Sequence, residues 1–463
     1  MGKVEEIKDN KMGIMPVNKL LVTMSLPIIA SMLMQACYNV VDSIFVSRIV
    51  DETSAGSAGT DALTAVGYVF PFQTLMIAFS TGMGVGMNAL LSRALGEKDD
   101  VLVNRAARNG IFLAICNTVF FMILGIFFAR TLILSQDGEG LALEYGVQYL
   151  RIVFIGSAGC CLQITMERLL QATGRTLLSM AVQMTGAIIN IILDPILIFG
   201  YFGFPEMKVA GAAVATITGQ LVGVVLGIIL NLKYNKEIRL SFRGFKPEWE
   251  IIKKIYSVGL PSIIMQSIGS VMTFFMNKIL TSLDVNSVAV FSVYFKLQSF
   301  FFMPLFGLNN GMIPIVAFNY GARKRTRMVK TIKLSMVYAF VVMLLGFIAF
   351  EIFPDKLLLL FDTKDESLLR LGVPALKIIA VHFLLAWFCI IALSAFQALG
   401  NGIYSLIVSA ARQLVVLLPV AFILSKIGGL DAVWWSFPVA ELMSVICSAF
   451  FLFRINKNII SKV

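Results

Sequence analysis

The stretch Gln183-Met-Thr-Gly-Ala-Ile-Ile-Asn190-Ile-Ile-Leu-Asp194-Pro195 has the greatest influence on how the chain is interpreted. It places a carboxylate near one end of an otherwise apolar helix, with an amide one turn before it. A charge at the centre of a bilayer costs about 2.5–3.5 kcal/mol on insertion scales. Asp194 therefore needs a proton, an ion, water or a charged partner, and the rest of the sequence helps to decide which.

The composition is typical of a membrane protein with many spans. Of the 463 residues, 58% are hydrophobic and only 14% are charged, whereas soluble domains carry about 25% charged residues. The net charge of +11 does not indicate nucleic-acid binding, because Lys and Arg fall in short segments between apolar runs. Six cysteines without a CxxC pair and the single His382 predict neither a metal site nor a disulfide framework.

Twelve segments are long and apolar enough to cross a membrane, which takes about 20 residues each. They are expected at 20–48, 62–90, 107–133, 143–167, 177–202, 209–232, 256–280, 287–316, 331–353, 372–398, 403–425 and 431–453. With the N-terminus inside, 26 Lys and Arg residues fall in inner segments and 8 in outer ones. The positive-inside rule then places both termini in the cytoplasm. We expect the protein to lie in the cell membrane and to contact its lipids.

The two halves of the chain repeat. Residues 62–105 align with 287–330 at a shift of 225, which superposes Gly86 on Gly311 and Gly96 on Gly321. We attribute these glycines to close helix packing, and we also expect Gly96 and Gly321 to be helix C-caps.

The repeat predicts an all-α integral membrane fold. Its twelve transmembrane helices form two six-helix lobes related by a pseudo-two-fold axis along the membrane normal. The expected parts are a cytoplasmic N-terminal tail at 1–19, an N-lobe at 20–232, a basic inter-lobe loop at 233–255, a C-lobe at 256–455 and a tail at 456–463.

Asp42 is a second carboxylate within an apolar helix. At a rise of 1.5 Å per residue, Asp42 lies about 33 Å along its helix and Asp194 about 26 Å along its own, so both fall in the outer half of the membrane. Each belongs to a polar stripe at helical spacing. The stripes are Gln35, Asn39 and Asp42 on one helix, and Gln183, Asn190 and Asp194 on the other. We expect the two stripes to face one chamber.

The repeat places Met276 and Val420 opposite Asp42 and Asp194. Residues that serve only the scaffold would recur more often in both halves, so we assign ion coupling to the N-lobe. Apolar surroundings favour a protonated carboxyl, and such a pair can exchange protons. The same oxygens, with Asn190 and a free backbone carbonyl, can instead hold Na+. The structural alternative is that each Asp caps a helix end or pairs with a neighbour.

The apolar helices also contain other charged side chains and several Met and aromatic side chains. Lys296, Arg412 and Glu441 lie in the second half, and we interpret them as a structural Glu–Arg or Glu–Lys pair in preference to a substrate site. Met and aromatic side chains suit varied apolar cations. The candidates for lining a substrate cavity are Met34, Gln35, Tyr38, Asn39, Gln183 and Met184.

At this point the chain resembles the multidrug and toxic compound extrusion (MATE) family, and most closely its DinF-like bacterial branch. The resemblance covers essentially the whole chain, and it depends on the order and spacing of several short motifs. These are Leu26-Pro27 with Asp42, Gln171-Ala-Thr-Gly174-Arg175, Asn190-Ile-Ile-Leu-Asp194-Pro195, Gly211-Ala-Ala-Val-Ala-Thr216, Pro314 to Ala322, and Gln397-Ala-Leu-Gly400.

The resemblance implies a V-shaped, two-lobe, monomeric transporter that needs no cofactor. It would export organic cations and drugs against inward H+, which is favoured, or Na+, by alternating access, and no metal other than Na+ is expected. In the DinF-like branch the coupling-ion site matches Asp42, Asn190, Asp194, Thr216 and the nearby carbonyl of Ala212. Pro27 matches a proline at which helix 1 is proposed to bend on protonation.

Two other functions stay open. A flippase for a lipid-linked precursor shares the two-lobe plan, but it is expected to carry a strongly basic cavity. An intramembrane enzyme would need a His, Cys or Ser constellation, and the chain has one histidine. One departure from the family concerns the C-lobe, where Met265-Gln266-Ser267 stands in the region at which NorM-like members place an acidic residue.

Overall fold

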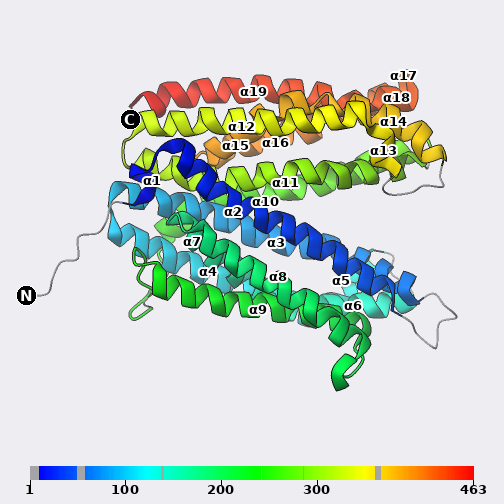
Figure 1. Ribbon diagram of the computed structural model, residues 1–463, viewed down its shortest axis with the longest axis horizontal. Helices are drawn as coiled ribbons and strands as arrows, with labels where there is room; N and C mark the ends of the chain where they lie inside the picture. Colours follow the sequence, from blue (N-terminus) through cyan, green and yellow to red (C-terminus); the bar gives the residue numbers. More distant parts are fainter. Residues whose placement is uncertain are drawn as a thin grey trace, which may run out of the picture. The chain divides into compact units, whose positions relative to one another are not determined.

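The computed structural model describes residues 10–49, 58–136, 140–240, 242–284, 286–359 and 366–462, and these ranges contain helices but no strand. Within these ranges, ten helices are long and apolar enough to span a membrane, or twelve if each of two bent pairs counts as one span. The twelve expected spans agree with this second count (Figure 1).

The first half of the chain contains the helices α1 Lys11–Ile14, α2 Val17–Ser47, α3 Ala58–Glu97, α4 Asp100–Phe127, α5 Ala129–Leu134, α6 Gly140–Ile155, α7 Ser157–Ala172, α8 Thr176–Phe199 and α9 Lys208–Tyr234. The second half contains α10 Trp249–Thr281, α11 Asn286–Gly321, α12 Arg325–Ile352, α13 Pro354–Leu359, α14 Glu366–Ala380, α15 Phe383–Ala398, α16 Gly402–Ala410, α17 Leu418–Ile427, α18 Gly429–Trp434 and α19 Ser436–Asn458. Three short elements complete the set: η1 Tyr201–Gly203, the π-helix η2 Ala411–Leu417 and η3 Ile460–Lys462.

The chain divides into two compact units. Unit 1 comprises the described parts of 1–29, 92–99 and 260–463, and unit 2 comprises those of 30–91 and 100–259. The helices α2, α3 and α10 each pass from one unit to the other. In α2 the division falls between Ile29 and Ala30, just after Pro27, and in α10 it falls between Gly259 and Leu260, just before Pro261. The predicted lobe boundaries at 20–232 and 256–455 stay a prediction.

The repeated glycines lie where helices cross within a unit. In unit 1, a Cβ added to Gly311 of α11 would lie 2.9 Å from the Cα atom of Ser25 in α2. In unit 2, the equivalent Gly86 of α3 faces the carbonyl oxygen of Ile255 in α10, and a Cβ there would overlap it. Only glycine allows backbones to approach this closely, which supports the packing interpretation of the repeat.

The ends of α3 and α11 cross in the same way within unit 1. A Cβ on Gly96 would overlap the carbonyl of Phe318, and one on Gly321 would overlap the carbonyl of Arg93. The expectation that these two glycines act as C-caps is wrong, because α3 continues to Glu97 and α11 ends at Gly321 itself. Close backbone contact, rather than chain reversal, requires glycine at both positions.

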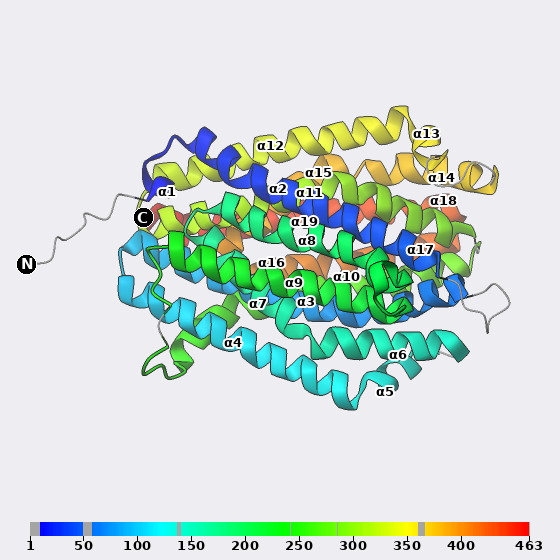
Figure 2. The same ribbon diagram turned by 60° about the horizontal axis from the view of Figure 1, so that its bottom comes forward.

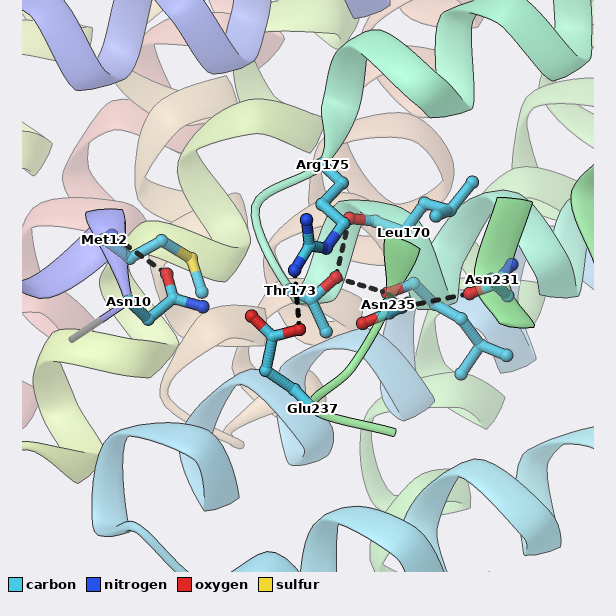
Figure 3. A network of polar contacts seen from close by, with 9 residues as sticks. Asn10, Met12, Leu170, Thr173, Arg175, Asn231, Asn235 and Glu237 are labelled. Atoms are coloured by element: carbon cyan, nitrogen blue, oxygen red, sulfur yellow. Dashed lines mark hydrogen bonds and ion pairs between the residues drawn. The ribbon is translucent and has the colours of Figure 1, made fainter. Parts of the chain in front are cut away.

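A polar network in unit 2 holds the turn between α7 and α8, where the motif Gln171 to Arg175 lies. Gly174 has a φ of 85°, which glycine adopts freely. Arg175 Nη2 lies 2.8 Å from Glu237 Oε2, and Asn235 Nδ2 donates to Asn231 Oδ1 at 3.0 Å (Figure 3). This motif therefore fixes how α7, α8 and α9 meet.

Two spans are bent. The pair α6 and α7 turns by 46° around Gly156, and the helical residues 369–398 turn by 51° between α14 and α15. In unit 2 the buried residues of α6 pack with those of α3, α4 and α9 in an apolar cluster that includes Tyr149 and Ala212. Figure 2 shows α8 and α9 side by side along this unit, as Figure 1 does. This core holds the helices that carry the candidate site.

Candidate functional site

The helices α8 and α9 form the rigid part of the site. Glycines allow them to approach, since a Cβ on Gly186 of α8 would lie only 3.1 Å from the carbonyl oxygen of Gly219 in α9. The polar residues one and two turns further along α8 are then fully enclosed: Asn190 is 3% exposed and Asp194 is 0% exposed. The apolar remainder of α8 offers these two side chains no other polar neighbours on their own helix.

A chain of hydrogen bonds links the two helices. Asn190 Nδ2 donates to Asp194 Oδ1 at 3.3 Å and to Thr216 Oγ1 at 3.3 Å. Thr216 Oγ1 in turn donates to the carbonyl of Ala212 at 3.0 Å. The structure thus brings together four of the five predicted ion-site residues, and the Ala212 carbonyl already accepts one side-chain bond.

The fifth residue, Asp42, comes from the part of α2 that belongs to unit 2. Its carboxylate interacts electrostatically with that of Asp194. The two polar stripes also meet directly, because Gln183 Nε2 donates to Gln35 Oε1 at 2.8 Å. The expected convergence of the two stripes therefore appears in the geometry of unit 2.

Acceptor oxygens outnumber donors in this site. Asp42 Oδ1, Asn190 Oδ1 and Asp194 Oδ2 are all buried, and none has a hydrogen-bond partner within the described ranges. A buried acceptor without a partner costs about 1–3 kcal/mol. A proton on a carboxyl, or a cation held by several oxygens, would satisfy these atoms, so the residues present fit a coupling ion.

Tyr149 is a member of the site that the sequence did not reveal. It lies on α6, is 3% exposed, and its hydroxyl is a hydrogen-bonding neighbour of Thr216 and an electrostatic neighbour of both carboxylates. Tyr149 belongs to neither polar stripe, so the helical spacing of polar residues does not indicate that it is part of the site. Tyr38 on α2 is a second aromatic neighbour of the two carboxylates.

The remaining candidates for the substrate cavity lie on the same helices as the candidate ion site. Met34, Tyr38 and Met184 are half-buried. The side chain of Asn39 falls outside the described part of the chain. Their role in binding substrate stays a prediction, as does that of Pro27, which lies inside a continuous α2.

The charged residues that the sequence places within apolar helices of the second half, Lys296, Arg412 and Glu441, lie in unit 1. Arg412 Nη1 is 3.1 Å from Glu441 Oε2, and Glu441 is 3% exposed, so these residues form an ion pair. Arg412 belongs to the π-helix η2, whereas Lys296 on α11 is exposed. His382 is buried and its ring packs against that of Tyr294 at a centroid distance of 6.5 Å.

One buried carboxylate, that of Glu167, is not among the predicted site residues, because the predicted span ends at this residue. Glu167 was the expected last residue of a span, but α7 continues to Ala172, and Glu167 is only 8% exposed. It accepts a hydrogen bond from Gln163 Nε2 at 2.9 Å. No group of three or more His, Cys, Asp or Glu residues in the described ranges is placed to hold a metal.

Comparisons with known proteins agree with this architecture. The MatE family model matches residues 27–196 and 261–423. The multidrug export protein MepA of Staphylococcus haemolyticus is 25% identical over 441 residues, covering 95% of this chain and 94% of the relative. MepA of Staphylococcus aureus strain MRSA252 is 26% identical over 446 residues, covering 96% and 95%.

Among solved structures, the chain is similar to the outward-facing conformation of a multidrug resistance MATE family transporter of the MOP superfamily. The TM-score is 0.89 at 25% sequence identity, with 98% of this chain and 99% of that chain covered. The match of fold, length and family model confirms the expected family, and this chain belongs to the MatE family of membrane transporters.

Proposed function

We propose that this protein is a secondary active multidrug exporter that exchanges lipophilic organic cations for an inward-moving coupling ion. The names of its relatives support the export of drugs. The coupling ion is assigned to the acceptor-rich site of unit 2, and we favour H+ over Na+. The chain is expected to act as a monomer in the cell membrane, with both termini in the cytoplasm.

Three buried oxygens, one each from Asp42, Asn190 and Asp194, have no hydrogen-bond partner among the described residues, and they carry this proposal. They come from two helices, and two of them are carboxylates that interact with each other. A membrane-buried pair of this kind is costly unless something positive joins it. The site therefore has a physical reason to take up a cation or a proton from the water outside.

A proton suits this arrangement better than a metal ion. Protonation of one carboxyl turns an acceptor into a donor, and that donor can serve the other carboxylate. Na+ would need several oxygens to converge, and the carbonyl of Ala212 already accepts a bond from Thr216. The freed carbonyl of Ile191, which lacks its usual partner because Pro195 has no N–H, is the remaining backbone candidate.

Coupling to substrate follows from shared helices. The cavity candidates Met34 and Tyr38 lie on the same helix as Asp42, and Met184 lies on the helix of Asp194. When an ion draws the two carboxylates together, α2 and α8 move relative to each other and the cavity lining changes. The linkage is reciprocal, so bound drug must weaken ion binding by the same factor as the ion weakens drug binding. Pro27 is the proposed hinge of α2.

The test is transport in proteoliposomes under separately imposed pH and Na+ gradients. Ethidium efflux is measured for the parent protein, for Asp42→Asn and Asp194→Asn, and for Asp431→Asn, which removes an exposed carboxylate of α18 as a matched control. We expect a pH gradient to drive efflux in the parent and the control only. Equal gradient-driven efflux in the site variants would refute the assignment.

A further inference from the structure

Unit 1 contains a cavity of about 840 Å³ at the end where α3 and α11 cross. Four segments that are distant in the sequence line it: 10–14 around α1, 93–98 at the end of α3, 318–324 at the end of α11, and 458–462 after α19. On the topology proposed above, this end faces the cytoplasm. The cavity is separate from the ion site, which lies in unit 2.

The lining of this cavity is strongly cationic. Among the described residues, its charged side chains are Arg93, Lys98, Arg323, Lys324 and Lys462, with Glu97 as the one carboxylate. Arg93 Nε is engaged by Glu97 Oε1 at 2.8 Å, and its guanidinium stacks 4.8 Å from the ring centroid of Tyr320. Arg93 is thus paired in place, and the described lining residues include more cations than carboxylates.

Two of these cations are equivalent positions of the internal repeat. Lys98 and Arg323 are related by the shift of 225, and each follows a glycine of the α3–α11 crossing by two residues. Their φ angles are 59° and 55°, in the left-handed region that Lys and Arg rarely adopt. Each of these two residues ends its helix in a Schellman turn, in which the next amide donates back to the helix, Asp99 N to Ala94 O at 3.0 Å and Lys324 N to Asn319 O at 2.8 Å. The two equivalent helix ends therefore place Lys98 and Arg323 at matching positions.

The positive-inside rule explains why basic residues are common at this end, but it does not explain their arrangement. It acts on whole segments and has no preference for where a side chain points. Here cations from three separate segments line one hollow, and two of them occupy symmetric positions on either side of a helix crossing. Within the described ranges, the other positive side chains of the inner segments do not line it.

The segment α1 closes one side of the cavity and is firmly attached. Asn10 caps α1 by accepting a bond from the Met12 amide at 3.0 Å (Figure 3). Lys324 Nζ donates to the carbonyl of Gly13 at 2.9 Å, and Asn319 Nδ2 donates to the carbonyl of Met12 at 3.2 Å. The cavity wall is therefore a built structure whose shape depends on the ends of α11 and α12.

We propose that this cavity binds a phosphate-bearing anion, held mainly by Lys98, Arg323 and Lys462. Arginine presents a planar fork that matches phosphate oxygens. Basic pockets between membrane helices on the cytoplasmic side take phospholipid headgroups. The same chemistry also suits a soluble phosphate. The site requires the ends of α3 and α11 to lie together, so an anion that binds it stabilises this crossing.

The binding test uses the full chain in detergent and does not depend on drug transport. Thermal unfolding is followed as inorganic phosphate is titrated, with sodium chloride at matched ionic strength as the reference. We expect phosphate to raise the unfolding temperature more than chloride does. The Lys98→Gln/Arg323→Gln variant should lose roughly 30-fold in apparent affinity, because each cation near an anionic surface contributes about a 5-fold factor.

Two control variants make the result decisive. Lys246→Gln/Lys254→Gln removes two exposed cations that do not line the cavity, and it should bind phosphate like the parent. Arg323→Lys keeps the charge and should bind better than the double Gln variant. If phosphate stabilises all variants equally, or no more than chloride does, its effect is general charge screening. The cavity then does not bind free phosphate.

A second arm distinguishes the two sources of phosphate. The protein is placed in nanodiscs of phosphatidylcholine alone or with added phosphatidylglycerol. If phosphatidylglycerol raises the unfolding temperature of the parent but not that of the Lys98→Gln/Arg323→Gln variant, the bound anion is a lipid headgroup. A response to free phosphate but not to phosphatidylglycerol identifies a soluble anion. A cavity variant that responds like the parent in both arms overturns the proposal.

Discussion

Replacing Asp194 with Asn exchanges one buried atom, the Oδ2 oxygen, for an amide nitrogen and leaves the side-chain shape unchanged. In the structure this oxygen is buried without a hydrogen-bond partner among the described residues, and the carboxylate interacts with that of Asp42. The amide supplies a donor where acceptors are in excess and removes one of two like charges. We expect the variant to be more stable than the parent by about 1–3 kcal/mol, the usual cost of an unpaired buried group.

The same change should abolish ion coupling. Coupling free energies of about 1–3 kcal/mol correspond to roughly 5- to 150-fold effects, and this factor should vanish from gradient-driven efflux. The assays are thermal unfolding in detergent and ethidium efflux in proteoliposomes with and without an imposed pH gradient. A variant that is less stable than the parent and still responds to the gradient would refute both the geometry and the role given to Asp194.

Three further changes test the helix packing, the ion pair in the second half of the chain and the candidate ion site. Gly96→Ala should destabilise the protein by about 1–3 kcal/mol in thermal unfolding, because its Cβ meets a backbone carbonyl, whereas Gly67→Ala meets nothing within 4 Å and should be neutral. Arg412→Met should cost about 3 kcal/mol by leaving Glu441 buried and unpaired, and adding Glu441→Gln should restore much of this loss; no recovery would contradict a structural ion pair. Tyr149→Phe should keep drug export but shift its gradient dependence about threefold to tenfold, as the loss of one hydrogen bond predicts, and an unchanged profile would exclude it from the site.

The sequence predicted most of the fold because apolar runs of spanning length are a strong signal. It placed the ends of long helices less well. The span expected to stop at residue 90 continues to Glu97, and the one expected to stop at 316 continues to Gly321. These last turns are held by contacts with another helix of the same unit, and tertiary contacts of this kind leave little trace in local composition.

The candidate site was predictable to the extent that its members are exceptions to their surroundings. Asp42, Asn190 and Asp194 are conspicuous because carboxylates and amides are rare in apolar helices. Tyr149 could not be found in this way, because its place beside Thr216 depends on how α6 packs against α9. The same holds for the glycines at the helix crossings. Their repetition is visible in the sequence, but the helices that they contact are not.

The most direct test of the ion site is proton release on drug binding. Purified protein in a weakly buffered solution is mixed with ethidium, and the change in pH is recorded for the parent and for Asp42→Asn/Asp194→Asn. If a proton held by these carboxylates competes with drug, the parent releases protons on binding and the double variant releases none. Drug binding without proton release by the parent, or equal release by the double variant, would contradict the account.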